Sequence, residues 1–299
     1  MAKELQIGII GLDTSHTVAF TKLLQGKDTP AEQTIEGMRI AHALRFPSPF
    51  QDEKGQNERQ AQMEALGVTM KATVPELAAG MDALFLEIND PALHLDFFRQ
   101  VAGLGLPVFI DKPLAANLAD GRDLVALAKE RRTNTWSSSS LRFVRALVAA
   151  RKKIPAVPTF CNVFGALGKA AAGSDVVWYG CHVTEMLVTA MGVGAQAVTA
   201  IEDPAGVVAV VSYPNNRRAI AEYSRGSYKY GGRIQAGNEV LYFDNTGDVL
   251  YYNLLVEIKR WLDTGVAPVS LEESLEVQAI MEAVEQSLAQ KKTVSLACC

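Results

Sequence analysis

The chain has 299 residues, of which 48% are hydrophobic and 21% are charged, as in ordinary globular proteins. This composition excludes a disordered or fibrous chain, and the length is typical of about two domains. With 29 Lys and Arg against 33 Asp and Glu, the net charge of -4 gives no electrostatic reason to expect nucleic acid as a partner. The sequence predicts no membrane span and no signal peptide, and its four cysteines form no Cys-x-x-Cys pair, so we expect a cytoplasmic protein.

The first half of the chain alternates between strand and helix patterns. In chain order, the predicted elements are strand 5–10, helix 14–24, strand 38–44, loop 47–55, helix 57–66, strand 82–88, helix 91–103, strand 107–110, helix 117–131 and strand 133–139. The last of these helices opens with Asn117 and Asp120, which resemble a capping box. The alternation predicts a parallel sheet with helices on both faces, that is, a doubly wound Rossmann domain over residues 1–140.

The second half follows a different pattern. A helix over 141–152 precedes segments rich in Val, Tyr, Phe and Thr that are separated by Gly, Pro or Asn. The predicted strands are 158–164, 196–202, 206–213, 217–224, 239–243 and 248–252, and the closing helices are 253–263 and 271–290. This order predicts an α+β domain over residues 141–299 with a largely antiparallel open sheet, within an α/β protein.

Four segments carry a resemblance to a known family. They are IGIIGLDTSH at 7–16, IDKPLAANLADGRDLVALAKE at 110–130, GCHVTEMLVTAMG at 180–192 and the pattern of residues 254–296. Together they resemble the Gfo/Idh/MocA family of glucose–fructose oxidoreductase, inositol dehydrogenase and their relatives. The resemblance implies a Rossmann domain that binds NAD or NADP and a sugar, polyol or similar hydroxylated small molecule as substrate. It also implies a homodimer or homotetramer formed through the second domain's sheet.

By position, the resemblance assigns the family's active-site lysine to Lys112 and its catalytic histidine to His182. Hydride transfer at a hydroxyl carbon leaves a proton to be managed, and a lysine or histidine can carry it. Lys112 follows a predicted strand, where doubly wound folds place ligands. Taken alone, Lys112 also fits a solvated loop lysine and His182 a buried core histidine.

The dinucleotide fingerprint is altered, because Gly11-Leu12-Asp13-Thr14-Ser15-His16 retains only the first of three glycines. A carboxylate at Asp13 about 5 Å from a phosphate would repel it by roughly 3 kcal/mol at an effective dielectric of about 20. Binding would weaken on the order of a hundredfold unless that side chain turns away. Asp13 or Thr14 also fits the N-cap of the helix that begins here.

Arg45 stands at the end of the second strand, where an acidic residue usually binds the adenosine ribose. An arginine there favours a 2′-phosphate and hence NADP, although an ordinary surface arginine fits equally well. The candidate cofactor-binding residues are Gly11, Asp13, Thr14, Ser15, His16, Arg45, Asn89, His94 and Asp111. For the Asn and Asp residues among them, loop capping is the alternative role.

In the second domain, Trp178 occupies the position where many relatives carry the aspartate that orients the histidine. Glu185, at near-turn spacing from His182, is a possible substitute, and Trp178 itself fits either a sugar-stacking residue or a packing residue. The candidate substrate-binding residues are Lys112, Arg142, Trp178, Tyr179, His182 and Glu185. We expect no metal, because the metal-capable Asp13, His16, His182 and Glu185 are far apart in the sequence.

These observations leave two functional hypotheses. The first is an NAD(P)-dependent oxidoreductase that acts by hydride transfer, with Lys112 and His182 managing the proton. The alternative is a non-redox relative, either a ligand-binding or regulatory protein or a lyase, that has lost ordinary dinucleotide binding. The altered fingerprint favours the alternative, whereas the retained Lys112-Pro113 pair and His182 favour the oxidoreductase.

Overall fold

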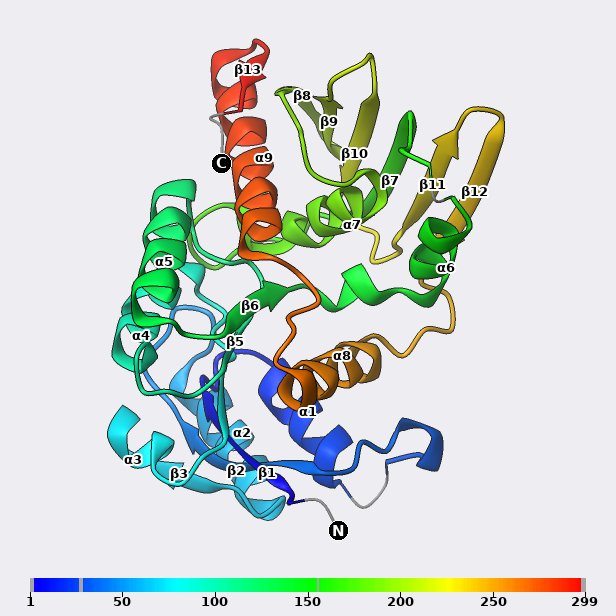
Figure 1. Ribbon diagram of the computed structural model, residues 1–299. Coiled ribbons are helices and arrows are strands. Elements are labelled where there is room, and N and C mark those ends of the chain that lie inside the picture. The colour runs from blue at the N-terminus through cyan, green and yellow to red at the C-terminus, as the bar shows by residue number, and fades with distance from the viewer. Residues whose placement is uncertain (1–2, 27–28, 155, 297–299) are drawn as a thin grey trace. The chain divides into compact units, whose positions relative to one another are not determined.

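The computed structural model describes residues 3–26, 29–154 and 156–296, which form two compact units (Figure 1). The first unit comprises Met1–Ser137 and Tyr251–Leu271, and the second comprises Ser138–Leu250 and Glu272–Cys299. Cys298 and Cys299 lie outside the described residues, whereas Cys161 and Cys181 are free thiols in the interior.

The first unit contains a six-stranded sheet in the order β3-β2-β1-β4-β5-β6, which is the Rossmann order. Its strands are β1 (Leu5–Ile10), β2 (Met38–Leu44), β3 (Thr69–Lys71), β4 (Ala83–Leu86), β5 (Val108–Asp111) and β6 (Thr135–Ser138). β1 pairs in parallel with both β2 and β4. Strands β2 and β3 therefore extend the sheet on one side of β1, and β4 to β6 extend it on the other. The predicted doubly wound parallel sheet is confirmed.

Helices cover both faces of this sheet. They are α1 (His16–Gln25), α2 (Glu53–Ala65), α3 (Val74–Ala78), α4 (His94–Val101) and α5 (Leu118–Arg131). In Figure 1, α4 and α5 lie together on one side of the sheet and α1 lies on the other. All four residues of β4 and of β5 are buried, as expected for strands with helices on both faces. The predicted cap of α5 is confirmed, since Asn117 Oδ1 accepts the backbone N–H of Asp120 at 2.9 Å.

The predicted division into the continuous segments 1–140 and 141–299 needs one correction, because α8 (Leu250–Thr264) belongs to the first unit. The buried face of α8 carries Trp261, whose ring meets that of Trp136 of β6 edge-on, with 6.0 Å between the ring centroids. Trp261 Nε1 also donates to Asn134 Oδ1 at 2.9 Å. The chain therefore leaves the first unit after Ser137, forms most of the second unit, and returns to the first with α8. It returns because the apolar face of α8 packs against the first unit.

The second unit is a seven-stranded sheet in the order β12-β11-β7-β10-β9-β8-β13. The strands are β7 (Phe160–Ala166), β8 (Ala197–Asp203), β9 (Gly206–Ser212), β10 (Arg218–Ser224), β11 (Gly231–Ala236), β12 (Glu239–Asp244) and β13 (Val294–Ser295). β7 and β10 are parallel, and the other pairs are antiparallel. The predicted, largely antiparallel second sheet is confirmed.

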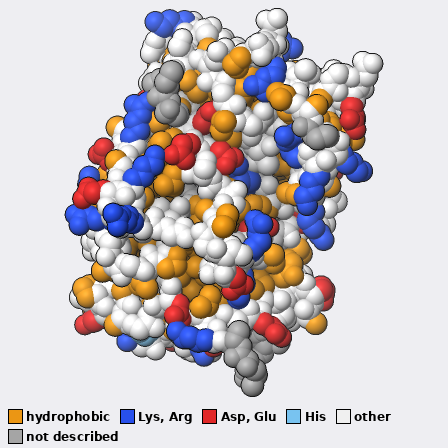
Figure 2. Space-filling view, viewed as in Figure 1, with side chains coloured by type: hydrophobic (Ala, Val, Ile, Leu, Met, Phe, Trp, Pro, Cys, Tyr) orange, Lys and Arg blue, Asp and Glu red, His pale blue; other side chains and the backbone are white. Residues whose placement is uncertain are grey.

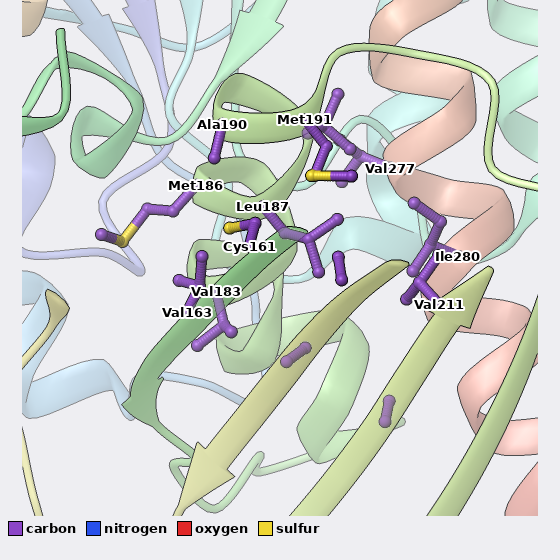
Figure 3. Close-up of a cluster of buried hydrophobic side chains, with 14 of the residues drawn as sticks. Cys161, Val163, Val183, Met186, Leu187, Ala190, Met191, Val211, Val277 and Ile280 are labelled. Atoms are coloured by element: carbon purple, nitrogen blue, oxygen red, sulfur yellow. The ribbon is translucent and has the colours of Figure 1, made fainter. Parts of the chain in front are cut away.

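One face of the second sheet is covered by α7 (Cys181–Met191) and α9 (Leu271–Gln290), and α6 (Arg145–Lys153) packs near β12. Figure 3 shows the core between them, to which α7 contributes Met186 and Leu187, β7 contributes Cys161 and α9 contributes Ile280. Buried and non-buried residues alternate along β9 and β10, because only one face of each strand packs against these helices.

Several element boundaries differ from the predictions for local reasons. Residues 248–252 were predicted as a strand from their Val, Leu and Tyr, but α8 begins at Leu250 because its apolar residues recur at helical spacing. Helix α2 begins at Glu53, inside the predicted loop, because Asp52 caps it by accepting the N–H of Gly55 at 2.8 Å. The short elements β3 and α3, and the strand β11, were not predicted.

The outer surface carries charges of both signs. In the view of Figure 2, Lys and Arg side chains are interspersed with Asp and Glu, in keeping with the nearly balanced composition. Among the described residues, no helix has the length and apolar character needed to cross a membrane.

Candidate functional site

The first group of predicted site residues lies at the carboxyl ends of β1, β4 and β5, where a doubly wound sheet binds ligands. Gly11 directly follows β1 and adopts φ 121°, a conformation that favours glycine. A Cβ atom at Gly11 would lie 1.9 Å from the carbonyl oxygen of Glu87. Glycine is therefore required here, because the chain after β1 passes directly against the chain after β4.

Asp13 bonds to two neighbouring loops and makes no side-chain cap bond to α1. Its carboxylate accepts the backbone N–H of Asn89 at 3.0 Å and the hydroxyl of Ser48 at 2.7 Å. The prediction that Asp13 caps α1 is wrong, since Ser15 is the N-cap residue and makes no side-chain cap bond. Thr14 Oγ1 accepts the N–H of His16 at 3.2 Å. The loops that carry Ser48 and Asn89 thus donate hydrogen bonds to the buried carboxylate, in place of the helix amides that a capping aspartate would use.

The position of Asp13 changes the electrostatics of the β1–α1 turn. The side chain is buried, and desolvation raises the pKa of Asp13 although its bonds to Ser48 and Asn89 oppose the shift. Asn89 also donates from Nδ2 to the backbone oxygen of Asp13 at 3.2 Å. Asn89 thus bonds both the side chain and the backbone of Asp13. The carboxylate makes no cap bond to the first amides of α1, which are the groups that hold a phosphate in this fold.

A pocket lies beside the end of β2, within the first unit. It is lined by Arg45, Phe46, Pro47, Ser48, Gln51, Asp52, Glu53 and Gln56. Arg45 Nη1 donates to Asn57 Oδ1 at 2.5 Å and to Gln60 Oε1 at 3.0 Å. Both acceptors are uncharged amides, so they fix the guanidinium without neutralising it. The pocket therefore offers one guanidinium that, among the described residues, is not paired with an acid, beside the carboxyl groups of Asp52 and Glu53 in the lining. It lies on the side of the sheet where the adenosine half of a dinucleotide lies in Rossmann folds.

Lys112 follows β5 and is buried beside two carboxyl groups. Asp111 Oδ2 lies 2.7 Å from His16 Nδ1, and Glu87 Oε2 lies 3.9 Å from the same nitrogen. Burial and then the charge of Asp111 raise the pKa of Glu87 well above its ordinary value, although Lys112 opposes this. Burial would also raise the pKa of Asp111, but the charges of His16 and Lys112 outweigh it and lower that pKa to about 2.

His94 lies in the interior of the first unit, and its predicted contact with a cofactor stays a prediction. The side chain is fully buried, with Nε2 2.8 Å from the carbonyl oxygen of Ile88 and Nδ1 3.2 Å from that of Leu114. His94 therefore connects the loops that follow β4 and β5 and supports the residues that face the ligand-binding edge. The ring has this position because His94 is the first residue of α4 and points inward.

In the second unit, His182 lies in the first turn of α7 and is 9% exposed. Its Nδ1 is 2.6 Å from the hydroxyl of Ser139, which also accepts the N–H of Leu141 at 3.1 Å. The rings of Tyr179 and Tyr230 meet the imidazole edge-on at 5.2 and 5.9 Å. Ser139 therefore occupies the orienting role for which the sequence offered no aspartate.

Glu185 is paired with Arg142, and its suggested role in orienting His182 stays a prediction. Its carboxylate accepts Arg142 Nε at 2.6 Å and the backbone N–H of Ser139 at 3.3 Å. Burial raises the pKa of Glu185, with the charge of Arg142 opposing the shift. Arg142 is itself 5% exposed and lies 3.3 Å from Glu273. The Arg142–Glu185 pair holds the segment that carries Ser139, and Ser139 in turn contacts His182.

The predicted stacking residue Trp178 is half-buried in the π-helical turn η4 (Val176–Gly180). Its ring is tilted against that of Tyr179 at 5.1 Å. Tyr179 is in contact with His182 as well, so Trp178 and Tyr179 extend an aromatic surface away from the imidazole. Their role in binding a substrate stays a prediction.

Sequence reasoning missed Glu87, and it noted the polar segment Ser137–Ser140 without singling out Ser139. Glu87 is an acid within the apolar run LFLEI, and a charged residue at the end of a buried strand is a signal that could have identified it. Ser139 is one of four consecutive serines, Ser137–Ser140, so nothing local distinguishes it from its neighbours.

Comparisons with known proteins agree with this architecture. Residues 49–137 match the family model GFO_IDH_MocA, described as an oxidoreductase family with an NAD-binding Rossmann fold. The resemblance seen in the sequence is thereby confirmed for this segment, which begins after the altered β1–α1 turn. A Salmonella typhimurium protein named "Putative oxidoreductase YceM" is 27% identical over 151 residues, which is 47% of this chain and 40% of that protein. The match thus spans less than half of the curated relative.

Solved structures share the fold over almost the whole chain. A probable dehydrogenase from Thermotoga maritima has a TM-score of 0.81 at 18% identity, covering 97% of this chain and 98% of that one. A scyllo-inositol dehydrogenase from Lactobacillus casei, with bound NAD(H) and scyllo-inositol, has a TM-score of 0.79 at 14% identity, covering 98% and 99%. At these identities the likeness establishes the two-unit fold alone.

Proposed function

We propose that this chain, whose first unit is similar to the Gfo/Idh/MocA oxidoreductases, is an NAD(P)-dependent oxidoreductase acting on a sugar, polyol or similar hydroxylated small molecule. The observation that carries the proposal is the orientation of Asp13. Its carboxylate is bound by Asn89 and Ser48, so the acid that replaces the second glycine makes no cap bond to the first amides of α1. The main objection to dinucleotide binding from the sequence is thereby weakened.

The residues of the first unit fit a dinucleotide. Gly11, Thr14 and Ser15 would hold the pyrophosphate at the start of α1, whose amides and dipole favour negative charge. Arg45 would bind on the adenosine side, in the pocket at the end of β2. His16, Asn89 and Asp111 stay predicted cofactor contacts. The nicotinamide, when bound, accepts or supplies the hydride.

The proton that accompanies the hydride is assigned to Lys112 and His182. Lys112 is buried next to Asp111 and Glu87, and an anionic neighbour helps to hold a buried ammonium group in place. Ser139 fixes the His182 ring through Nδ1, so proton exchange by this histidine would take place at Nε2. Arg142 and Glu185 support that arrangement, and Trp178 and Tyr179 supply an aromatic surface for a sugar or polyol.

Titration with NADH and NADPH, followed by quenching of tryptophan fluorescence, tests the proposal. Wild type is expected to show saturable quenching, since Trp136 and Trp261 lie in the first unit. We expect NADPH to bind about tenfold to a hundredfold more tightly than NADH, because a hydrogen bond to a charged group contributes about 1.5–3 kcal/mol. Arg45→Ala should abolish this preference, whereas the surface variant Arg99→Ala should keep it.

Two outcomes would favour the non-redox alternative instead. One is the absence of saturable quenching with either nucleotide. The other is binding that appears only in Asp13→Gly, which would mean that the acid blocks the site in the natural chain. Equal affinity of wild type for NADH and NADPH would be consistent with the proposed oxidoreductase but would contradict the proposed selection of NADPH by Arg45.

We also propose that the protein is cytoplasmic and self-associates as a homodimer or homotetramer through the second sheet. The strands β8 and β9 expose Ile201 and Val208, which are 69% and 37% accessible on the face that α7 and α9 leave uncovered. Exposed apolar residues on an open sheet are typical of an interface. Light scattering should therefore give at least twice the chain mass, and Ile201→Lys should lower it. A monomeric wild type would contradict the proposal.

A further inference from the structure

Three side chains that can bind a metal meet at the carboxyl edge of the first sheet. His16 opens α1, Glu87 directly follows β4 and Asp111 ends β5. One donor atom from each lies within 4.8 Å of the others. The rings of Phe20 and Tyr251 contact the imidazole at 5.8 and 5.0 Å and fix its orientation.

Glu87 has an unusual environment for a carboxyl group. Its side chain is 0% exposed, and neither carboxyl oxygen has a hydrogen-bond partner among residues 3–26, 29–154 and 156–296. Buried polar groups are nearly always hydrogen-bonded, so an exception requires a reason such as a bound ion. Oε2 of Glu87 faces the other two groups, 3.9 Å from His16 Nδ1.

We propose that His16, Glu87 and Asp111 bind a divalent first-row transition-metal ion, such as Zn²⁺ or Mn²⁺. Ligand atoms around such an ion are about 3–3.5 Å apart when each bond is about 2.0–2.2 Å. The donor atoms of Asp111 and Glu87 lie 2.7 and 3.9 Å from His16 Nδ1, and all three atoms are within 4.8 Å of one another, so the side chains would adjust around a bound ion. The imidazole nitrogen selects against Mg²⁺ and Ca²⁺, which prefer oxygen ligands.

The surroundings also suit a cation. Glu87 and Asp111 supply two carboxyl groups as oxygen ligands, and Lys112 is a neighbouring positive charge. The side chains of His16 and Asp111 are 13% and 2% exposed, so an ion would enter from the His16 side. Three protein ligands leave a coordination position for water or a substrate oxygen. This inference replaces the expectation of no metal, and it does not depend on dinucleotide binding.

Metal binding to the untagged full-length protein tests the inference, in the absence of any nucleotide. Protein treated with EDTA and dialysed would be equilibrated with ZnCl₂, MnCl₂ or MgCl₂, and the bound metal counted by mass spectrometry. We expect one equivalent of Zn²⁺ or Mn²⁺ and little Mg²⁺. Glu87→Gln and His16→Gln should each weaken binding at least about tenfold. His42→Gln is the matched control, because His42 contacts the carbonyl oxygen of Leu77 on the same sheet and should leave binding unchanged.

X-ray absorption of the zinc-loaded wild type gives a second readout that needs no variant to fold. The inference expects one imidazole and otherwise oxygen ligands around the zinc. No binding by wild type, binding of Mg²⁺ as tight as that of Zn²⁺, or undiminished binding in folded Glu87→Gln would overturn it. A sulfur ligand or a second imidazole would overturn it as well. Because no nucleotide is present, failure of the NADH and NADPH titration would leave this result unaffected.

Discussion

Replacing Lys112 with methionine is expected to lower kcat at least about a hundredfold, because general acid–base catalysis contributes about 10²–10⁴-fold. The measurement is steady-state turnover on whichever member of a panel of inositols and aldoses the wild type oxidises. Methionine keeps the length of the side chain but cannot exchange a proton. The affinity for the nucleotide should stay nearly intact, since the pyrophosphate and adenosine contacts proposed above lie in the turn between β1 and α1 and directly after β2.

The control for this prediction addresses charge. Lys112 lies next to Glu87 and Asp111, so removing its ammonium leaves two buried acids without their positive neighbour and destabilises the fold as well. Lys112→Arg keeps the positive charge but does not release a proton near neutral pH. If the lysine is catalytic, the arginine variant should recover thermal stability without recovering turnover. A wild-type rate in Lys112→Met would discard the catalytic role.

Glu185→Gln should lower the free energy of unfolding by about 3–5 kcal/mol, the cost of leaving one member of a buried ion pair uncompensated. Arg142 and Glu185 are 5% and 3% exposed, and their charged atoms are 2.6 Å apart. The remaining acidic partner of Arg142 is Glu273, which is farther away at 3.3 Å and partly exposed. Urea denaturation followed by circular dichroism measures the effect.

Two further variants separate charge from position. The double variant Arg142→Met/Glu185→Leu should recover most of the lost stability, because apolar residues of similar volume often replace a buried pair without cost. Ser139→Ala leaves the ion pair intact but removes the hydroxyl that contacts His182, so it should lower turnover with a much smaller effect on stability. A loss below about 1 kcal/mol in Glu185→Gln would show that Arg142 is compensated by other means.

The sequence by itself determined the fold class and the identity of many elements. Strand 38–44 and helix 271–290 coincide with β2 and α9 residue for residue, because their patterns are long and their ends carry clear turn or cap signals. Lys112 and Gly11 were placed at strand ends for the same reason. Short elements such as β3 and α3 escaped because three to five residues carry too little periodicity.

Tertiary structure alone decided which side chains meet. Ser139 and His182 are 43 residues apart, Asp13 and Asn89 are 76 apart, and His16 and Asp111 are 95 apart. Periodicity describes which face of one element is buried, and it carries no information about which atom of a distant loop will face that element. The packed sheet and helices were therefore needed to show three contacts. Asp13 bonds to Asn89 and Ser48, Glu185 pairs with Arg142, and two acids lie beside His16.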